Sequence, residues 1–299
     1  MATTLDWYGC ATFRLRTAGL TVFLDAYVDR AANAPGTGLT ADDIEECDWI
    51  VVGHSHFDHL YGAERIARNT GARIVGSYET VRIMEQAGVA ADRMIPVAGG
   101  ETIALSDDVR VSVFPSQHSC VWSQTRMTGA DEVCLGDLGL TLQEQQARFQ
   151  QLVAYLSTGL PPDSLSHLLA AQQGDRGDGG ALVYLFETPG GRVFYQDTSG
   201  HWSGALRQMR DRRPDVAIIA AAGRGNVDGQ PVQGSLAQFV AREVELLQPR
   251  RVVLSHHDDW LPGFSVDTDL TPIRQALAEL PGQVELLELG YLDGTPILP

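Results

Sequence analysis

Four short and almost continuously apolar segments of this chain each run into a histidine or an aspartate. Residues 48–52 lead to His54, and comparable segments lead to His118, Asp197 and His256. Apolar runs of this length are typical of strands that are covered on both faces. Sites in α/β proteins gather at the carboxyl ends of such strands, so the pattern predicts an α/β fold in which all four segments contribute to one site.

Helices and hairpins are predicted between these strands. Apolar residues recur at helical spacing from Leu60 to a stop at Gly71, and they share one face over residues 236–247. Two hairpins are expected, one that reverses at Ala18-Gly19 and one at the Pro-Gly-Gly turn of residues 189–191. No linker or internal repeat divides the chain, which predicts a single domain over residues 1–299.

Residues 119–179 form an insertion of different character between the two strand-rich halves. Two helices are expected there, on either side of a Pro-Pro break, followed by a flexible glycine-rich stretch. A long insertion in a compact fold is more often a functional lid than an idle loop, although a mobile surface excursion is the alternative. We expect it to cap the active site through residues at a pocket mouth and an apolar helix face: Trp122, Arg126, Met127, Phe149, Leu152, Val153 and Leu156. A helix face of this kind is more often simply core.

The charge balance argues against nucleic acid as a partner. The chain carries 38 acidic and 22 basic residues, a formal net charge of -16, which would repel a phosphate backbone. Every basic residue is an arginine, so Schiff-base and P-loop lysine chemistry are excluded.

Cysteine usage and the N-terminus predict a cytoplasmic protein. Cys10, Cys47, Cys120 and Cys134 lie far apart without a Cys-x-x-Cys pair, which fits reduced thiols better than a disulfide framework or a zinc ribbon. The first residues do not resemble an export signal, and no segment reaches the roughly 18 apolar residues of a membrane span. Membrane insertion is therefore not expected.

The stretch HSHFDH, residues 54–59, concentrates metal-ligand side chains in the turn after a strand. Imidazole nitrogens and carboxylate oxygens suit zinc, iron or manganese. His54 and His56 fall on one side of an extended segment, while Asp58 and His59 are directed away by the turn, so two adjacent metals can share this loop. The alternative is a hydrogen-bonded histidine cluster that caps the following helix. Taken singly, His118, Asp197 and His256 also have structural explanations, as core residues or as a helix cap.

These four motifs, HSHFDH and then His118, Asp197 and His256, resemble in this order those of the metallo-β-lactamase fold superfamily of metal-dependent hydrolases. The opening stretch DWYGCATFRLRTAGLTVFLDAYVD is also similar to the branch that includes the ascorbate-phosphate lactonase and the N-acyl-phosphatidylethanolamine phospholipase D enzymes. That branch often has a histidine after the glycine, where this chain has Cys10.

The resemblance implies a four-layer αββα sandwich with the site at one edge, between the two sheets. It also implies two divalent metal ions, Zn²⁺ first, with Mn²⁺ or Fe²⁺ as alternatives. One metal would be held by His54, His56 and His118, and the other by Asp58, His59 and His256, with Asp197 bridging both.

The resemblance further implies hydrolysis by a metal-bridging hydroxide, since a pair of such ions lowers the pKa of a shared water. Asp58 would be the catalytic residue that orients the hydroxide and carries a proton to the leaving group. The expected substrate is a small molecule, an ester, lactone, amide or phosphodiester. A di-iron redox protein and a non-catalytic metal-binding protein on the same scaffold are the alternatives, and self-association into a homo-oligomer stays open.

Three further residues are candidates for supporting roles. Asp25 could fix a ligand histidine or cap the next turn. His201 could be a proton donor near the site or a surface histidine. His257 points away from His256 along its strand and is expected to be structural or to support a ligand. His167, in the insertion, has no assigned role.

Overall fold

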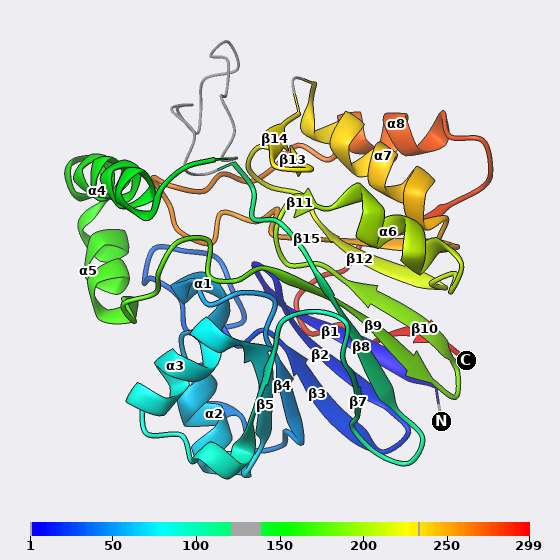
Figure 1. Ribbon diagram of the computed structural model, residues 1–299, viewed down its shortest axis with the longest axis horizontal. Helices are drawn as coiled ribbons and strands as arrows, with labels where there is room; N and C mark the ends of the chain where they lie inside the picture. Colours follow the sequence, from blue (N-terminus) through cyan, green and yellow to red (C-terminus); the bar gives the residue numbers. More distant parts are fainter. Residues whose placement is uncertain (1, 121–138, 233) are drawn as a thin grey trace.

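The computed structural model describes residues 2–120, 139–232 and 234–299, which form two large β-sheets packed face to face with helices on both outer faces (Figure 1). The layers follow the order helix, sheet, sheet, helix. This is the four-layer αββα sandwich that the sequence predicted, and the prediction is confirmed. Of the described helices, none is both long and apolar enough to cross a lipid bilayer.

Each large sheet has seven strands among the described residues. In spatial order, the first contains β17 (Thr295–Leu298), β1 (Thr3–Gly9), β2 (Thr12–Thr17), β3 (Leu20–Leu24), β4 (Trp49–Val51), β5 (Arg73–Ser77) and β6 (Met94–Val97). The second contains β16 (Glu285–Leu287), β15 (Arg251–Ser255), β12 (Val216–Ala220), β10 (Gly191–Tyr195), β9 (Leu182–Thr188), β8 (Arg110–Pro115) and β7 (Thr102–Ala104). A small third sheet joins β11 (Gly200–His201), β13 (Asn226–Val227) and β14 (Gln230–Pro231).

Helices close the outer face of each sheet. The first sheet is covered by α1 (Phe57–Leu60), α2 (Ala63–Thr70) and α3 (Tyr78–Gln86), and the second by α6 (Ser203–Arg210), α7 (Leu236–Leu247) and α8 (Thr271–Ala278). Short 3₁₀ turns occupy Ala41–Asp43 and Ala91–Arg93. Both sheets are therefore buried on both faces, which explains why their strands are so uniformly apolar.

The central core lies between the two sheets and follows strand alternation. On β2, Phe13 and Leu15 point into this core, while Arg14 and Arg16 bind the carboxylate of Asp6. On β12, successive side chains point to opposite faces of the sheet. Ile218 belongs to the central core, and Ile219 packs under the outer helices. Burial of each such side chain contributes about 1.5–3 kcal/mol.

The predicted hairpins and stop signals are present. The turn between β2 and β3 places Ala18 at φ 49° and Gly19 at φ 80°, the left-handed pair that a two-residue hairpin requires. Helix α2 ends at Gly71, which also has a positive φ of 80°.

The described part of the insertion contains two helices, α4 (Leu142–Gly159) and α5 (Pro162–Ala171), which lie together at one end of the sandwich (Figure 1). Helix α5 is tied to the loop after β3: His167 Nε2 lies 2.8 Å from the Tyr27 hydroxyl, and Asn33 Nδ2 donates to Ser164 Oγ at 3.1 Å. His167 is thus a candidate anchor of the insertion. Trp122, Arg126 and Met127 lie outside the described residues, and the role of residues 119–179 as a cap stays a prediction.

Candidate metal centre

The side chains predicted to bind metal all follow the carboxyl ends of strands at the end of the sandwich that carries α4 and α5. The stretch after β4 provides four of them and the loops after β8, β10 and β15 provide one each: His54, His56, Asp58, His59, His118, Asp197 and His256. Parallel pairing of β3 with β4 and of β10, β12 and β15 brings these strand ends to the same edge.

His54, His56 and His118 form one group of donors. His54 Nε2 lies 3.1 Å from His56 Nδ1, and the His118 ring is centred 4.7 Å from the His54 ring and 4.6 Å from the His56 ring. The outward-facing nitrogens have backbone partners: His118 Nδ1 donates to Ser119 O at 2.8 Å, and His56 Nε2 lies 3.1 Å from Gly177 O. Such contacts fix the tautomer and leave His118 Nε2 and His56 Nδ1 for a metal.

A second group combines Asp58 and His256 with a residue that the sequence analysis did not select as a ligand. Asp58 Oδ2 lies 3.2 Å from His256 Nε2, and Cys10 Sγ lies 3.5 Å from the same nitrogen. One donor atom from each of the three lies within 4.8 Å of the other two. The signals in the sequence were the position of Cys10 directly after a strand and the histidine that the similar branch often has there.

His59 stands between the two groups and is held by Asp25. His59 Nε2 is 3.3 Å from Asp58 Oδ2, and its Nδ1 is 2.6 Å from Asp25 Oδ2. The Asp25 carboxylate also accepts hydrogen bonds from the Tyr195 hydroxyl at 2.7 Å and from Gly53 N at 2.8 Å. Asp25 therefore contacts a candidate ligand rather than the turn that follows β3.

The Asp197 carboxylate gives an independent indication of a cation. It is fully buried, and its Oδ2 lies 2.6 Å from His54 Nδ1 and 3.4 Å from His59 Nδ1. Its Oδ1 has no hydrogen-bond partner within the described parts of the chain, which is costly for a buried carboxylate oxygen. A Cβ on Gly53 would lie 2.1 Å from the Asp197 carboxylate, so glycine is needed for this approach. The donor set and the unpaired oxygen both fit divalent metal ions.

The protonation states differ among the donors of the centre. Burial, and then the neighbouring imidazoles, hold the pKa of His54 and of His118 well below the usual value, so both are neutral at pH 7 and already in their metal-binding form. Although burial opposes it, the acidic groups around His59 and His256 raise the pKa of His59 well above the usual value and that of His256 to about 10, so a metal would have to displace a proton from each.

Burial raises the pKa of Asp25 and of Asp197 to about 6. For Asp58 burial acts in the same direction, but His59 and His256 outweigh it and hold the pKa well below the usual range.

Three non-glycine residues of the centre have left-handed backbone conformations. The φ angles are 49° at Cys10, 56° at Asp25 and 63° at His256. Non-glycine residues rarely adopt this region, and the strain they store is concentrated at functional sites in proteins.

Two of the candidate supporting residues lie elsewhere. His201 is 1% exposed, with its ring stacked on Phe239 and its Nδ1 3.8 Å from Glu243 Oε2, and it does not line the pocket. The expectation of a proton donor at the site is therefore not met, because β11 directs this side chain under α7. The His257 ring stacks on Trp7 with centroids 4.5 Å apart, a structural contact.

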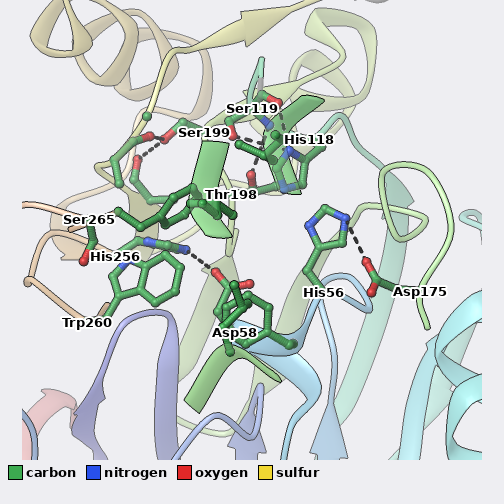
Figure 2. Close-up of a pocket in the computed structure, with 18 of the residues that line it drawn as sticks. His56, Asp58, His118, Ser119, Asp175, Thr198, Ser199, His256, Trp260 and Ser265 are labelled. Atoms are coloured by element: carbon green, nitrogen blue, oxygen red, sulfur yellow. Dashed lines mark hydrogen bonds and ion pairs between the residues drawn. The ribbon is translucent and has the colours of Figure 1, made fainter. Parts of the chain in front are cut away.

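A cavity of about 190 Å³ adjoins the two donor groups (Figure 2). His56, Asp58, His118 and His256 line it from several sides, together with Asp175, whose Oδ2 is 3.4 Å from His56 Nε2. Most of the remaining wall is apolar and comes from the insertion and the loop after β15: Phe149, Leu152, Val153, Leu156, Leu168, Trp260, Phe264 and Val266. The predicted apolar face of α4 thus lines the cavity and does not join the sandwich core.

We expect Asp25→Asn to weaken metal binding about 10- to 100-fold, because His59 would lose the carboxylate that orients it. The measurement is competition with a chromogenic chelator. Asp6→Asn is the matched control, since Asp6 is a buried carboxylate on β1 whose hydrogen-bond partners among the described residues are Arg14 and Arg16. Equal metal affinity in the Asp25→Asn variant and the wild type would contradict the proposed orienting contact.

Comparison with known proteins agrees with this geometry. Residues 21–150 match the model of the beta-lactamase superfamily domain. A metal-dependent hydrolase of Anaeromyxobacter sp. (strain K) is 26% identical over 257 residues, which cover 85% of this chain and 74% of that protein. A metal-dependent hydrolase of Pyrobaculum arsenaticum is 33% identical over 117 residues, or 38% of this chain and 50% of that protein.

Two solved structures share the fold at low sequence identity. Igni18, a metallo hydrolase from Ignicoccus hospitalis, superposes with a TM-score of 0.62 at 16% identity over 98% of this chain and 97% of that one. CmlA, a diiron β-hydroxylase from Streptomyces venezuelae, has a TM-score of 0.56 at 16% identity over 96% of this chain and 53% of that one.

Proposed function

We propose that this chain, which is similar to the beta-lactamase superfamily domain over residues 21–150, is a metal-dependent hydrolase of a small, uncharged and largely apolar ester, lactone or amide. The observation that carries the proposal is the position of the two donor groups in the lining of an apolar cavity. Two divalent cations held by these groups would lower the pKa of water and polarise the oxygen of the bond to be cleaved.

Asp58 is the residue best placed to move a proton. Its Oδ2 lies between His59 Nε2 at 3.3 Å and His256 Nε2 at 3.2 Å, and the side chain faces the cavity (Figure 2). These two imidazoles keep the carboxylate ionised, so it can accept a proton from the attacking water. It can then return that proton to the leaving group.

The walls of the cavity favour a neutral substrate. The chain contains no lysine, and no arginine is among the described residues that line the cavity, whereas Asp58 and Asp175 are both there. Beyond the metal ions themselves, an anionic substrate would thus meet carboxylates and no basic side chain to bind it. This argues for esters, lactones or amides over phosphodiesters.

Two of the hydroxyl groups that line the cavity already donate hydrogen bonds to other groups of the protein. Ser199 Oγ donates to Ala222 O at 2.7 Å, and Ser265 Oγ donates to Asp259 Oδ1 at 2.7 Å. The body of the substrate is therefore expected to bind by apolar contact with α4, α5 and the loop of residues 260–266.

A series of neutral aryl esters with acyl chains of increasing length tests the proposal. We expect kcat/KM to rise about fourfold per methylene until the cavity is full, since each buried methylene contributes about 0.8 kcal/mol. Bis(p-nitrophenyl) phosphate should be a poor substrate. Preference for this diester, or no dependence on chain length, would contradict the assignment of substrate class.

Leu152→Asn is expected to flatten this dependence on chain length. Leu152 lines the cavity from α4, so a polar side chain there should raise KM for long acyl chains and leave acetyl esters unaffected. Gln150→Asn, on an exposed position of the same helix, is the control. The idea that α4 contributes to specificity would be wrong if both variants showed the wild-type profile.

The alternative function is oxidative di-iron chemistry, because the diiron β-hydroxylase CmlA shares this fold. Two zinc ions per chain with chelator-sensitive hydrolysis would support the hydrolase. Iron with an oxygen-dependent change in the absorption spectrum would support the alternative.

A further inference from the structure

We propose that the Cys10 thiolate is a ligand of the second metal, together with Asp58 and His256, and that it makes this half of the centre selective for zinc over manganese. The inference rests on the proposed function, because it deepens the description of the same metal site. It assigns a ligand to a position at which the similar branch often has histidine.

The donor atoms of the three residues are close enough to share one ion. Cys10 Sγ is 3.5 Å from His256 Nε2, which is 3.2 Å from Asp58 Oδ2, and all three atoms lie within 4.8 Å of one another. Zinc is bound by sulfur at about 2.3 Å and by imidazole nitrogen at about 2.0–2.1 Å. Separations of this size are those of atoms around a common metal.

The backbone holds the thiol in this position. His256 N donates to Cys10 O at 2.7 Å, Trp7 Nε1 donates to the same oxygen at 3.0 Å, and Cys10 N donates to Asp258 Oδ1 at 2.9 Å. Residues 10 and 256 are therefore joined directly, although 246 positions separate them in the sequence.

Strain and packing support the same conclusion. Both Cys10 and His256 have a positive φ, a conformation that non-glycine residues rarely adopt and that is often found at functional sites. Gly9, which precedes Cys10, has a φ of 91°, and a Cβ on it would lie 2.7 Å from Arg30 Nη2. The turn that presents the sulfur is thus built around a residue that has to be glycine.

Cys47 provides a contrast within the same chain. Both thiols are buried and free, and each donates to a backbone carbonyl, Cys47 to Trp49 O at 3.2 Å and Cys10 to Asp58 O at 3.6 Å. Cys47 packs under α2 and α3 and belongs to none of the donor groups found among the described residues. Burial raises the pKa of Cys47 to about 12, so it stays protonated. Cys47→Ser is consequently a matched control for Cys10→Ser.

Ligation by Cys10 has a definite chemical consequence. As the sulfur–metal bond forms, the thiol proton leaves to solvent, and no oxidant or reductant is involved. A soft thiolate favours zinc or cobalt over manganese, which prefers oxygen ligands. The two halves of the centre should therefore differ in metal preference.

Cobalt substitution tests the proposal without an activity measurement. Metal-free wild type and Cys47→Ser, each loaded with two equivalents of Co²⁺, should show a sulfur-to-cobalt charge-transfer band in the near ultraviolet. Cys10→Ser should lack this band, retain the visible bands of cobalt in the other site, and bind zinc at least tenfold more weakly in the altered site. An unchanged near-ultraviolet band in Cys10→Ser would overturn the proposal.

X-ray absorption of the zinc-loaded wild type gives a second test that needs no variant. We expect a sulfur neighbour at about 2.3 Å from zinc. Two bound zinc ions with only nitrogen and oxygen neighbours would refute ligation by Cys10 while leaving the proposed hydrolase intact. Failure of the wild type to bind any metal would overturn both.

Discussion

The Asp58→Asn variant is expected to lose about 10²- to 10⁴-fold in kcat/KM on its best ester substrate, the range associated with a positioned acid–base group. The asparagine side chain keeps the size of Asp58 but carries no charge and cannot accept the proton of the attacking water. It also gives up the ion pairs with His59 Nε2 and His256 Nε2, 3.3 and 3.2 Å away.

The variant should still hold metal in the group formed by His54, His56 and His118. Metal analysis and circular dichroism on the same sample separate a loss of catalysis from a loss of structure. Asp92→Asn, which alters an exposed carboxylate in a 3₁₀ turn away from the cavity, should match the wild type. Turnover within threefold of wild type in Asp58→Asn would show that another residue moves the proton.

Removal of the metal ions is expected to abolish hydrolysis and to lower the melting temperature. The centre buries His54, His59, Asp25 and Asp197, each at most 1% exposed, and the Oδ1 of Asp197 lacks a hydrogen-bond partner in the described structure. Metal at a thousand times its Kd stabilises the folded state by about 4 kcal/mol. For a domain of this size the loss corresponds to a decrease in Tm of about 8 °C.

Scanning calorimetry before and after chelation measures this decrease. Chelator that is already saturated with zinc serves as the control, and added zinc should restore both Tm and turnover. If the chelated, metal-free protein kept full activity, a metal-dependent mechanism would be excluded. An unchanged Tm would show that the buried carboxylates are stabilised in some other way.

The layered fold and most of the centre could be predicted because the signals are local. The strand before His54 is apolar on both faces, and residues that directly follow such strands are confined to the carboxyl edge of a sheet. The same rule located His118, Asp197 and His256. Pairing of strands far apart in sequence was not needed for these predictions.

The contribution of Cys10 depends on information that is not local. Its thiol approaches His256 only because both residues adopt positive φ angles and a backbone hydrogen bond joins them. A sequence pattern contains neither fact. His201, in contrast, was selected as a candidate because it lies four positions from Asp197 in the sequence. The short strand β11 turns its side chain toward Phe239 under α7, away from the donor groups.

The character of the cavity also depends on tertiary structure. An apolar helix face such as that of α4 predicts burial, but not the surface against which it is buried. Contacts of α5 with the loop after β3, through His167 and Tyr27, place the insertion above the donor groups. The preference for a neutral, apolar substrate therefore follows from the tertiary structure and not from the sequence pattern.

Anomalous diffraction at the zinc edge, from crystals of the zinc-loaded protein, tests the central claim most directly. If this claim holds, the map will show two peaks about 3.5–4 Å apart, one among His54, His56 and His118 and the other beside Asp58 and His256. A single peak, or peaks away from the donor groups that line the cavity, would contradict it.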